Sequence, residues 1–222
     1  MKFSIIIPVF NEAAGIGEQL EYLLSISDPD CEIIVIDGGS GDQTLIEVEK
    51  FPVTVVKSIR SGRAVQMNAG ATVASGDALI FLHADTRLPP AAFARIRERE
   101  FHWGFFAVNL SGKHWFFRVI EWAINARSSL TKVATGDQTL FVRRALFEDL
   151  GGFAEIPLME DVELSKRLRS LFSPTVLPAK VLTSSRYWEQ NGIVHTVILM
   201  WRLRFEYFCG VSPERLRRRY YR

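Results

Sequence analysis

Several carboxylates follow apolar stretches of this chain, and carboxylates bind divalent cations and accept protons in enzymes. Asp85 comes shortly after the residues IFL, and Asp37 comes directly after EIIVI. Glu160 and Asp161 form an adjacent acidic pair further along the chain. No residue directly beside Asp85 neutralises its charge, so its partner has to come from elsewhere in the fold or from a ligand.

The segments around these carboxylates alternate between strand and helix. Continuous apolar runs rich in β-branched residues indicate strands buried on both faces, and apolar residues at helical spacing indicate the helices between them. The alternation predicts an α/β fold with a doubly wound, mostly parallel sheet, right-handed crossovers and flanking helices. The expected strands are residues 3–9, 32–37, 53–57 and 78–82, and the expected helices are residues 12–27, 43–50, 63–74 and 89–99.

The carboxyl ends of these strands are the expected binding edge, because ligands of open parallel sheets bind beyond that edge. Asn11, Asp37 and Asp85 each follow an expected strand and should line one crevice. We expect one domain of residues 1–190 and a C-terminal helical extension of residues 191–222 packed on it. In the less regular second half, strands are expected at residues 103–110, 139–143 and 175–183, and helices at residues 115–130, 144–150, 160–171 and 193–208.

The bulk composition is ordinary for a globular protein, with 48% hydrophobic and 23% charged residues among 222. A net charge of +2 gives no reason to expect a nucleic acid partner. The N-terminal apolar run is too short for a signal peptide, and no run of about 20 apolar residues predicts a spanning helix. We therefore expect a cytoplasmic protein, with the inner face of the membrane as the alternative.

Cys31 and Cys209 have no spacing typical of a metal or disulfide framework, which fits a reducing compartment. The last residues, 215–222, are strongly basic. For them we favour a solvated chain end over contact with phosphates or an anionic membrane.

The glycine-rich stretch DGGSGD, residues 37–42, invites comparison with nucleotide-binding loops. A dinucleotide-binding GxGxxG would follow the first strand, whereas these glycines follow the second, which argues against NAD. The P-loop pattern is absent, which weighs against an ATPase. The segment PVFNEAAGIG contains no basic residue, which weighs against a nucleotidyltransferase. Taken alone, DGGSGD is a tight turn that caps the next helix.

Taken together, the motifs resemble the family 2 glycosyltransferases, which are inverting enzymes with a GT-A fold. The resemblance rests on PVFNE, DGGSGD, GRAVQMNAG, HAD and ED, which occur in this order. Each motif is short, and their joint order is what makes the resemblance specific. The form GRAVQMNAG with LHAD and GDQ is similar to a bacterial subgroup of these enzymes. The resemblance implies transfer of a sugar from a nucleotide-sugar donor, with uracil the commonest base in the family.

Position by position, the resemblance implies a donor site at the strand ends. Asp37 would accept a hydrogen bond from the base or the ribose, with Asp42 beside it. Arg63 would lie near the nucleotide, and Asn68 and Gly70 would shape the helix packed there. The implied donor-binding residues are Pro8, Phe10, Asn11, Glu12, Asp37, Asp42, Arg63, Asn68 and Asp85.

The resemblance also implies a metal site and a catalytic base. Asp85 would bind Mg²⁺ or Mn²⁺, which stabilises the diphosphate leaving group, while phosphate oxygens and water complete the coordination. The family often carries two acids, DxD, but the first position here is His83, which we expect to be packed or behind the site. An inverting transfer needs a base across the sugar from the leaving group. Motif position selects Asp161 for this role over Glu160.

Further candidates lie in the second half of the chain. The turn GDQ either contacts the acceptor or the sugar, or is only a polar turn. Arg186 and Trp188 partly match an Arg-Trp element near the acceptor in relatives. His195 lies where some GT-A enzymes place a metal-binding His, but we favour a packed helix residue. The acceptor or sugar region therefore comprises Gly136, Asp137, Gln138, Glu160, Arg186 and Trp188.

Two expected helices, residues 115–130 and 193–208, are rich in aromatic and bulky side chains. We favour packing between them in the core over an interfacial surface, which would suit peripheral membrane contact or a homodimer. A lipid-linked acceptor would make such a surface useful. The sequence does not name the sugar or the acceptor. The rival to an active transferase is a degenerate member that binds a nucleotide or a partner without catalysis, an alternative that His83 keeps open.

Overall fold

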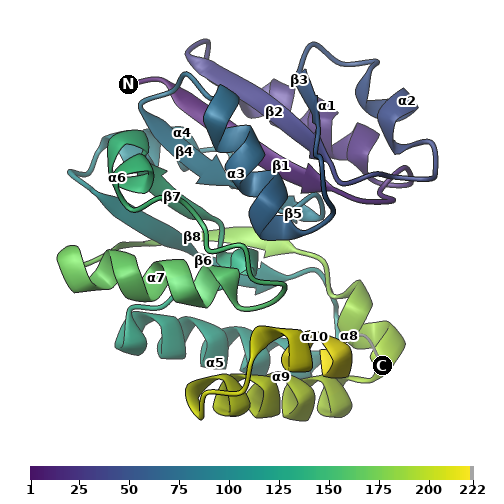
Figure 1. Cartoon of the computed structure of the whole chain (residues 1–222), viewed down its shortest axis with the longest axis vertical. Coiled ribbons are helices and arrows are strands. Elements are labelled where there is room, and N and C mark those ends of the chain that lie inside the picture. The colour runs from purple at the N-terminus through teal and green to yellow at the C-terminus, as the bar shows by residue number, and fades with distance from the viewer. Residues whose placement is uncertain (221–222) are drawn as a thin grey trace.

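The sheet has eight strands in the order β3-β2-β1-β4-β7-β6-β8-β5 in a computed structural model, which describes residues 1–220 (Figure 1). β1 runs parallel to β2 and β4, and β2 runs parallel to β3. β7 is antiparallel to both β4 and β6, so the parallel half continues into a mixed half. The strands are β1 (Phe3–Val9), β2 (Cys31–Asp37), β3 (Thr54–Lys57), β4 (Ala78–Phe81), β5 (Thr86–Arg87), β6 (Trp103–Leu110), β7 (Leu140–Arg143) and β8 (Thr175–Thr183).

Helices cover both faces of this sheet because successive side chains of a strand point to opposite faces. Ile5 and Ile7 of β1 belong to one apolar cluster with α1 and α4, and Ile6 belongs to another with α3, α6 and α7. The helices are α1 (Ile16–Ile26), α2 (Thr44–Val48), α3 (Arg63–Val73), α4 (Ala92–Arg97), α5 (Trp115–Thr131), the 3-10 turn η1 (Gly136–Gln138), α6 (Arg144–Asp149), α7 (Glu160–Leu171), α8 (Arg186–Asn191), α9 (Ile193–Phe208) and α10 (Pro213–Tyr220).

The register of the parallel strands aligns the ends that carry the polar motifs. Val9 at the end of β1 lies opposite Asp37 at the end of β2. Asn11 then turns the chain with a φ of 56°, in the left-handed region that Asn tolerates better than most residues. The crevice expected from the sequence therefore begins at this edge.

The basic chain end differs from the expectation. Pro213 to Tyr220 form α10, which packs on α9, and its Leu216 is fully buried. The helix forms because this one apolar side chain is anchored in a cluster with Leu203. The prediction of a solvated end is therefore wrong through residue 220, and residues 221–222 lie outside the described part.

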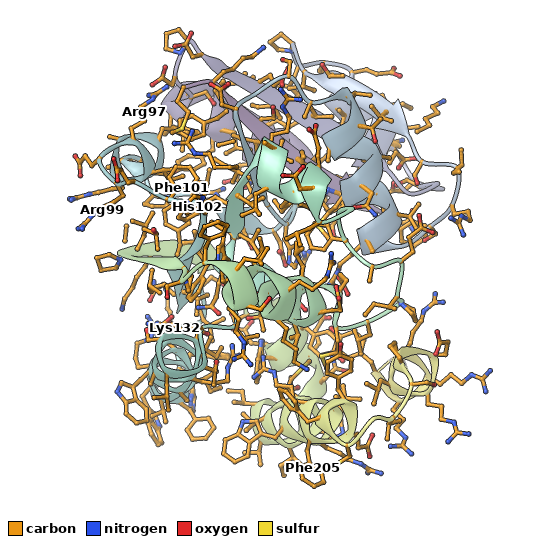
Figure 2. All side chains as sticks on the ribbon, turned by 60° about the vertical axis from the view of Figure 1, so that its left-hand side comes forward. Arg97, Arg99, Phe101, His102, Lys132 and Phe205 are labelled. Atoms are coloured by element: carbon orange, nitrogen blue, oxygen red, sulfur yellow. The ribbon has the colours of Figure 1, made fainter. Side chains whose placement is uncertain are left out.

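The two aromatic helices also differ from the expectation of mutual core packing. Each is covered only in part: Phe117 and Ile120 of α5 cluster with Ile193 and Val197 of α9, and Leu203 of α9 is buried in a cluster with Leu216 of α10. Phe205 is 69% exposed, and Figure 2 shows it pointing away from the rest of the molecule. The other exposed large apolar side chains of these two helices are Trp115, Val119, Trp122, Leu130, Val194, Ile198, Trp201 and Phe208. Figure 1 shows α5, α9 and α10 at the end of the molecule opposite to α2 and β3.

None of the helices within residues 1–220 combines the length and the apolar character that crossing a bilayer requires. Cys31 and Cys209 are both free thiols, as their spacing indicated.

Candidate active site

A cavity of about 1240 Å³ opens at the carboxyl ends of β1 and β4 and extends between the C-terminal helices. On the sheet side its wall contains the segment after β1, the start of α3 and the segment after β4. On the other side it is lined by α5, α8, α9 and α10. Five of the predicted donor residues line it: Pro8, Phe10, Glu12, Arg63 and Asp85. His83, which was expected to be packed or behind the site, lines it as well.

Asp85 has the environment that the sequence predicted for an unneutralised carboxylate. Its side chain is exposed and lines the cavity. Within residues 1–220, its carboxylate accepts one side-chain hydrogen bond, from the Thr86 hydroxyl at a long 3.4 Å. In the described part of the chain, no Lys, Arg or His forms an ion pair with it. Asp85 is therefore available to a cation that enters with a ligand.

Glu12 lies beside Asp85 and feels its charge. Burial raises the pKa of Glu12 above its ordinary value, and Asp85 raises it further. Arg186 opposes this shift, and its Nη2 lies 3.8 Å from Oε2 of Glu12. Arg63, at the start of α3, also lowers the pKa of Glu12. Around Asp85 the cavity thus holds a second carboxylate, Glu12, and two guanidinium groups, those of Arg63 and of Arg186 from α8 on the other side.

In the glycine-rich turn of residues 37–42, polar side chains accept hydrogen bonds from nearby backbone N–H groups. The Asp37 carboxylate is 3% exposed and accepts hydrogen bonds from the backbone N–H of Gly39 and Ser40 at 3.0 and 3.1 Å. The Asn11 side chain accepts from Gly41 N–H at 2.9 Å, and Asp42 accepts from Ala13 N–H at 3.1 Å. Asn11, Asp37 and Asp42 are thus tied to the turn and do not line the cavity.

Asn68 and Gly70 of α3 also do not line the cavity, and they hold α3 in place beside it. The Asn68 side chain exchanges two hydrogen bonds of 2.9 Å with the backbone of Phe153. A Cβ on Gly70 would lie 2.6 Å from both Ile36 and Ile6, so glycine lets α3 approach the sheet closely.

The two adjacent acids at the start of α7 point in different directions, as neighbours on a helix must. Glu160 lines the cavity and is only 5% exposed. Burial raises the pKa of Glu160, and the neighbouring Asp161 raises it further. The Asp161 carboxylate accepts from Gly136 N–H at 2.6 Å and from Val162 N–H at 2.7 Å, and it does not line the cavity.

The turn η1 connects these acids to the segment after β4. His83 Nδ1 lies 3.5 Å from the Asp137 carboxylate, which lines the cavity. Enclosure raises the pKa of Asp137, but the hydrogen bond from His83 and the charge of Arg63 outweigh this and lower it overall. Gln138 is buried and accepts from the Ser128 hydroxyl at 2.6 Å. The GDQ turn is therefore divided: Asp137 faces the cavity, and Gln138 is a structural residue.

The remaining candidates also divide into residues that line the cavity and residues that do not. Arg186 and Trp188 of α8 both line the cavity, as the acceptor region requires. His195 is exposed and does not line it, so the preferred interpretation of a packed residue is wrong. His83 is 14% exposed and packs against Gly136, in agreement with the preferred interpretation for that residue.

Two cavity residues escaped the sequence analysis: Arg127 of α5 and Arg204 of α9. A signal was present, because each is a cation on a helix made mainly of apolar and aromatic residues. The sequence could not tell that both helices turn these cations toward one cavity, since that depends on tertiary packing.

The metal suggested by the sequence has a limited protein ligand set. Residues 1–220 contain no group of three or more His, Cys, Asp or Glu side chains arranged to hold an ion. Asp85 alone fits a Mg²⁺ or Mn²⁺ ion that takes its remaining ligands from substrate phosphates and water.

Comparison with known proteins adds the family. Residues 4–99 match the model of glycosyl transferase family 2. A Haemophilus influenzae protein named as an uncharacterized glycosyltransferase is 35% identical over 39% of this chain and 30% of its own length. A Mycobacterium tuberculosis PGL/p-HBAD biosynthesis glycosyltransferase is 29% identical over 88% of this chain and 80% of its own length. A third relative, YdaM of Bacillus subtilis, is covered over 55% of its length, so this chain spans only part of some relatives.

Solved structures share the fold. Staphylococcus aureus TarS 1–349 in complex with UDP-GlcNAc aligns with a TM-score of 0.67 and 22% identity, over 83% of this chain and 58% of that one. The mannosyltransferase PcManGT from Pyrobaculum calidifontis, in complex with GDP-Man and Mn²⁺, aligns with a TM-score of 0.64 and 22% identity, over 82% and 56%. The α/β sheet with flanking helices is therefore of the GT-A type.

Proposed function

We propose, from the match of residues 4–99 to glycosyl transferase family 2 and from the similarity to named glycosyltransferases, that the chain transfers a sugar from a nucleotide-sugar donor to an acceptor with inversion at the anomeric carbon. A UDP-sugar is the proposed donor. The observation that carries the proposal is Asp85, an exposed carboxylate with no cationic partner among the described residues, facing a large cavity at the strand ends.

The sheet side of the cavity suits the donor. Phe10 presents a ring that is 52% exposed, on which a base can stack, and Arg63 and Arg186 supply positive charge for the diphosphate. The backbone of the DGGSGD turn, held by Asp37 and Asn11, forms the edge beside them. Two similar structures hold UDP-GlcNAc and GDP-Man, which supports a nucleotide-sugar without choosing between uracil and guanine.

Asp85 is the residue proposed to hold the divalent cation. When bound there, Mg²⁺ or Mn²⁺ would neutralise negative charge that develops on the diphosphate leaving group. Two structures of the same fold contain Mn²⁺, one of them with UDP, which supports this assignment. The neighbouring Arg186 keeps Glu12 paired, so that Asp85 is the freer of the two carboxylates.

Asp161 remains the proposed general base, with Glu160 as its rival. The acceptor hydroxyl has to lose a proton as its oxygen attacks the sugar from the face opposite the diphosphate. Asp161 occupies the position of the ED motif that the family resemblance assigns to the base, but its carboxylate oxygens accept hydrogen bonds from two backbone N–H groups. Glu160 faces the cavity, and its raised pKa brings it nearer to neutral pH. For Asp161 to act, η1 has to release its hydrogen bond to the carboxylate.

Isosteric variants test whether Asp161 or Glu160 is the general base. We expect Asp161→Asn to lower the hydrolysis of UDP-GlcNAc or another accepted UDP-sugar, measured with Mn²⁺, by at least about 100-fold, a typical contribution of general-base catalysis. UDP binding, measured by calorimetry, should stay within twofold. A larger loss of turnover in Glu160→Gln than in Asp161→Asn would transfer the role of base to Glu160.

The non-catalytic alternative has a distinct outcome in the same assay. A degenerate member that only binds a nucleotide or a partner would bind UDP with Mn²⁺ and hydrolyse none of a panel of UDP- and GDP-sugars. This alternative is motivated by His83, which occupies the first acidic position of the DxD motif. His83 pairs with Asp137, and Asp85 is the one acid of the motif that lines the cavity.

We also propose that residues 191–220 act as an extension that completes the acceptor side and meets the membrane surface. The exposed apolar side chains on α5 and α9 support membrane contact, since Trp and Phe suit the headgroup region. Arg215 and Arg218 of α10 are exposed nearby and would favour anionic lipids. The proposed location is the cytoplasmic face of a membrane, with a homodimer through the same face as the alternative.

A further inference from the structure

Arg127 and Arg204 line the helical side of the cavity, away from the elements that carry the donor residues. Arg127 belongs to α5 and Arg204 to α9, whereas the donor side is built from the segments after β1 and β4 and from α3. Each arginine is partly buried, although both lie on helices with exposed outer faces. Their charged ends are thus directed into the molecule, where placing a cation costs free energy.

The protein itself leaves these two cations incompletely paired. Arg127 donates to the Val133 carbonyl at 3.3 Å and to the Ser128 hydroxyl at 2.9 Å, and its buried Nε has no partner. Within residues 1–220, the Arg204 guanidinium makes neither a hydrogen bond nor an ion pair. Neither arginine is therefore satisfied by a carboxylate in contact.

The nearby carboxylates are committed elsewhere. Asp161 and Asp137 are close enough to raise the pKa of Arg204, but burial outweighs them and lowers it. Asp161 is held by backbone N–H groups, and Asp137 is paired with His83. Burial and the charge of Arg204 lower the pKa of Arg127 to about 10, so both groups are still cations at pH 7. Two enclosed cations that repel each other form a site for an anion.

The walls around these cations are apolar and lead to the outside. Phe116, Val119 and Ile120 of α5 and Val197, Met200 and Trp201 of α9 line the cavity, and Phe116, Ile120 and Val197 pack in one apolar cluster. Val119 and Trp201 are also among the exposed apolar side chains, at 45% and 68%. The cavity therefore reaches the same apolar face that α5 and α9 present to solvent.

We propose that Arg127 and Arg204 bind the anionic headgroup of an amphiphilic acceptor, a phosphate monoester or a carboxylate attached to an apolar chain that leaves between α5 and α9. This inference rests on the proposed function and names its acceptor class. A small polar acceptor would leave the apolar walls without a partner, and a neutral lipid would leave the two cations without one. The headgroup would lie beside Glu160 and Asp137, on the side of the cavity where an acceptor hydroxyl is deprotonated.

The test uses n-decyl phosphate below its micelle concentration as the probe, with n-decanol, inorganic phosphate and UDP–Mn²⁺ as the other arms, all measured by calorimetry. We expect the protein to bind n-decyl phosphate at least tenfold more tightly than n-decanol or inorganic phosphate. Arg127→Gln and Arg204→Gln should each weaken n-decyl phosphate binding at least tenfold and leave UDP–Mn²⁺ binding within twofold.

Two kinds of control keep the result interpretable. Arg202→Gln changes an exposed cation on the same helix that is paired with Glu206, so it should change no affinity. Arg204→Lys keeps the charge and should keep most of the affinity for n-decyl phosphate. Equal losses in Arg204→Lys and Arg204→Gln would assign the effect to packing and overturn the proposal.

Other outcomes are equally decisive. Equal affinity for n-decyl phosphate and n-decanol would overturn the anion site. Loss of UDP–Mn²⁺ binding in the two Gln variants would show that the arginines serve the donor diphosphate, which also overturns the proposal. If the unmodified protein binds n-decyl phosphate as expected but not UDP, the proposed function fails while the anion site stands.

Discussion

At the scale of single residues, what separates cavity residues from supporting ones is whether nearby backbone N–H groups already satisfy the side chain. Phe10, Glu12, Arg63 and Asp85 line the cavity, whereas Asn11, Asp37 and Asp42 bond to nearby backbone N–H groups. Asn and Asp in turns prefer such local bonds. The sequence therefore predicted the neighbourhood of each residue correctly, but motif position could not show which carboxylates would be satisfied by the chain itself.

Glu160 provides a residue-scale prediction about pH. Its pKa in the fold is raised above the ordinary value of 4.5, first by burial and then by Asp161. The folded state therefore favours protonated Glu160, and this contribution to stability is complete below pH 4.5 and is lost as pH rises through the folded pKa. We therefore expect Glu160→Gln to raise the free energy of unfolding at pH 7.5, because the amide carries no charge to bury.

Urea unfolding at pH 4 and pH 7.5 checks this prediction. The gain in Glu160→Gln should shrink toward zero at pH 4, where the wild-type side chain is also neutral. Glu21→Gln, an exposed position on α1, is the matched control and should give no pH-dependent difference. The same gain at both pH values would show that charge burial at Glu160 is not its cause.

At the scale of elements, hydrophobic pattern located most helices and strands. β1, β6, α7, β8 and α9 have the expected bounds. α1 begins at Ile16 rather than residue 12 because a turn closed by the hydrogen bond from Gly15 N–H to the Glu12 carbonyl precedes it. The two-residue β5 and the short α8 were not expected, since segments of this length have no readable periodicity.

The orientation of α5 and α9 was the larger error. An apolar helix predicts that its face will be buried, but the sequence does not say against what. In the structure, each helix is covered only in part, and the large aromatic side chains point outward.

Packing of α3 on the sheet gives an element-scale prediction. Gly70→Ala would place a Cβ 2.6 Å from Ile36 and Ile6, which forces α3 away from β1 and β2. We expect the free energy of unfolding to fall by about 1–3 kcal/mol, the usual cost of overpacking. Gly15→Ala has open space around its Cβ and a negative φ, so it should be nearly neutral. Urea unfolding of both variants measures the difference, and equal stabilities would show that the helix and sheet are not closely packed here.

At the scale of the whole molecule, the exposed aromatic face of α5 and α9 lies at one end, away from α2 and β3 (Figure 1), and the cavity extends from the strand ends to these helices. The donor side is predictable from the sequence because its motifs follow strands in order. The acceptor side is not, because it is assembled from α5, α8, α9 and α10, which are separated along the chain by unrelated segments.

Membrane contact is the prediction that belongs to this scale. We expect the protein to sediment with phosphatidylglycerol-containing vesicles, and Trp122→Ser combined with Phe205→Ser to lower the bound fraction at least fivefold. Burial of these exposed rings in the interface is the physical reason. Ile46→Ser removes an exposed apolar group on α2, at the opposite end, and should have no effect. Stable dimers without vesicle binding, seen by analytical ultracentrifugation, would instead assign this face to a second copy.

The central claim is that Asp85 holds a cation between the protein and a nucleotide diphosphate. Its most direct test is calorimetry of UDP binding with and without Mn²⁺, on the wild-type protein and on Asp85→Asn. We predict that Mn²⁺ strengthens UDP binding by at least tenfold in the wild type and by less than twofold in Asp85→Asn. UDP affinity that is independent of Mn²⁺ in the wild type, or that responds equally in both proteins, would contradict the account.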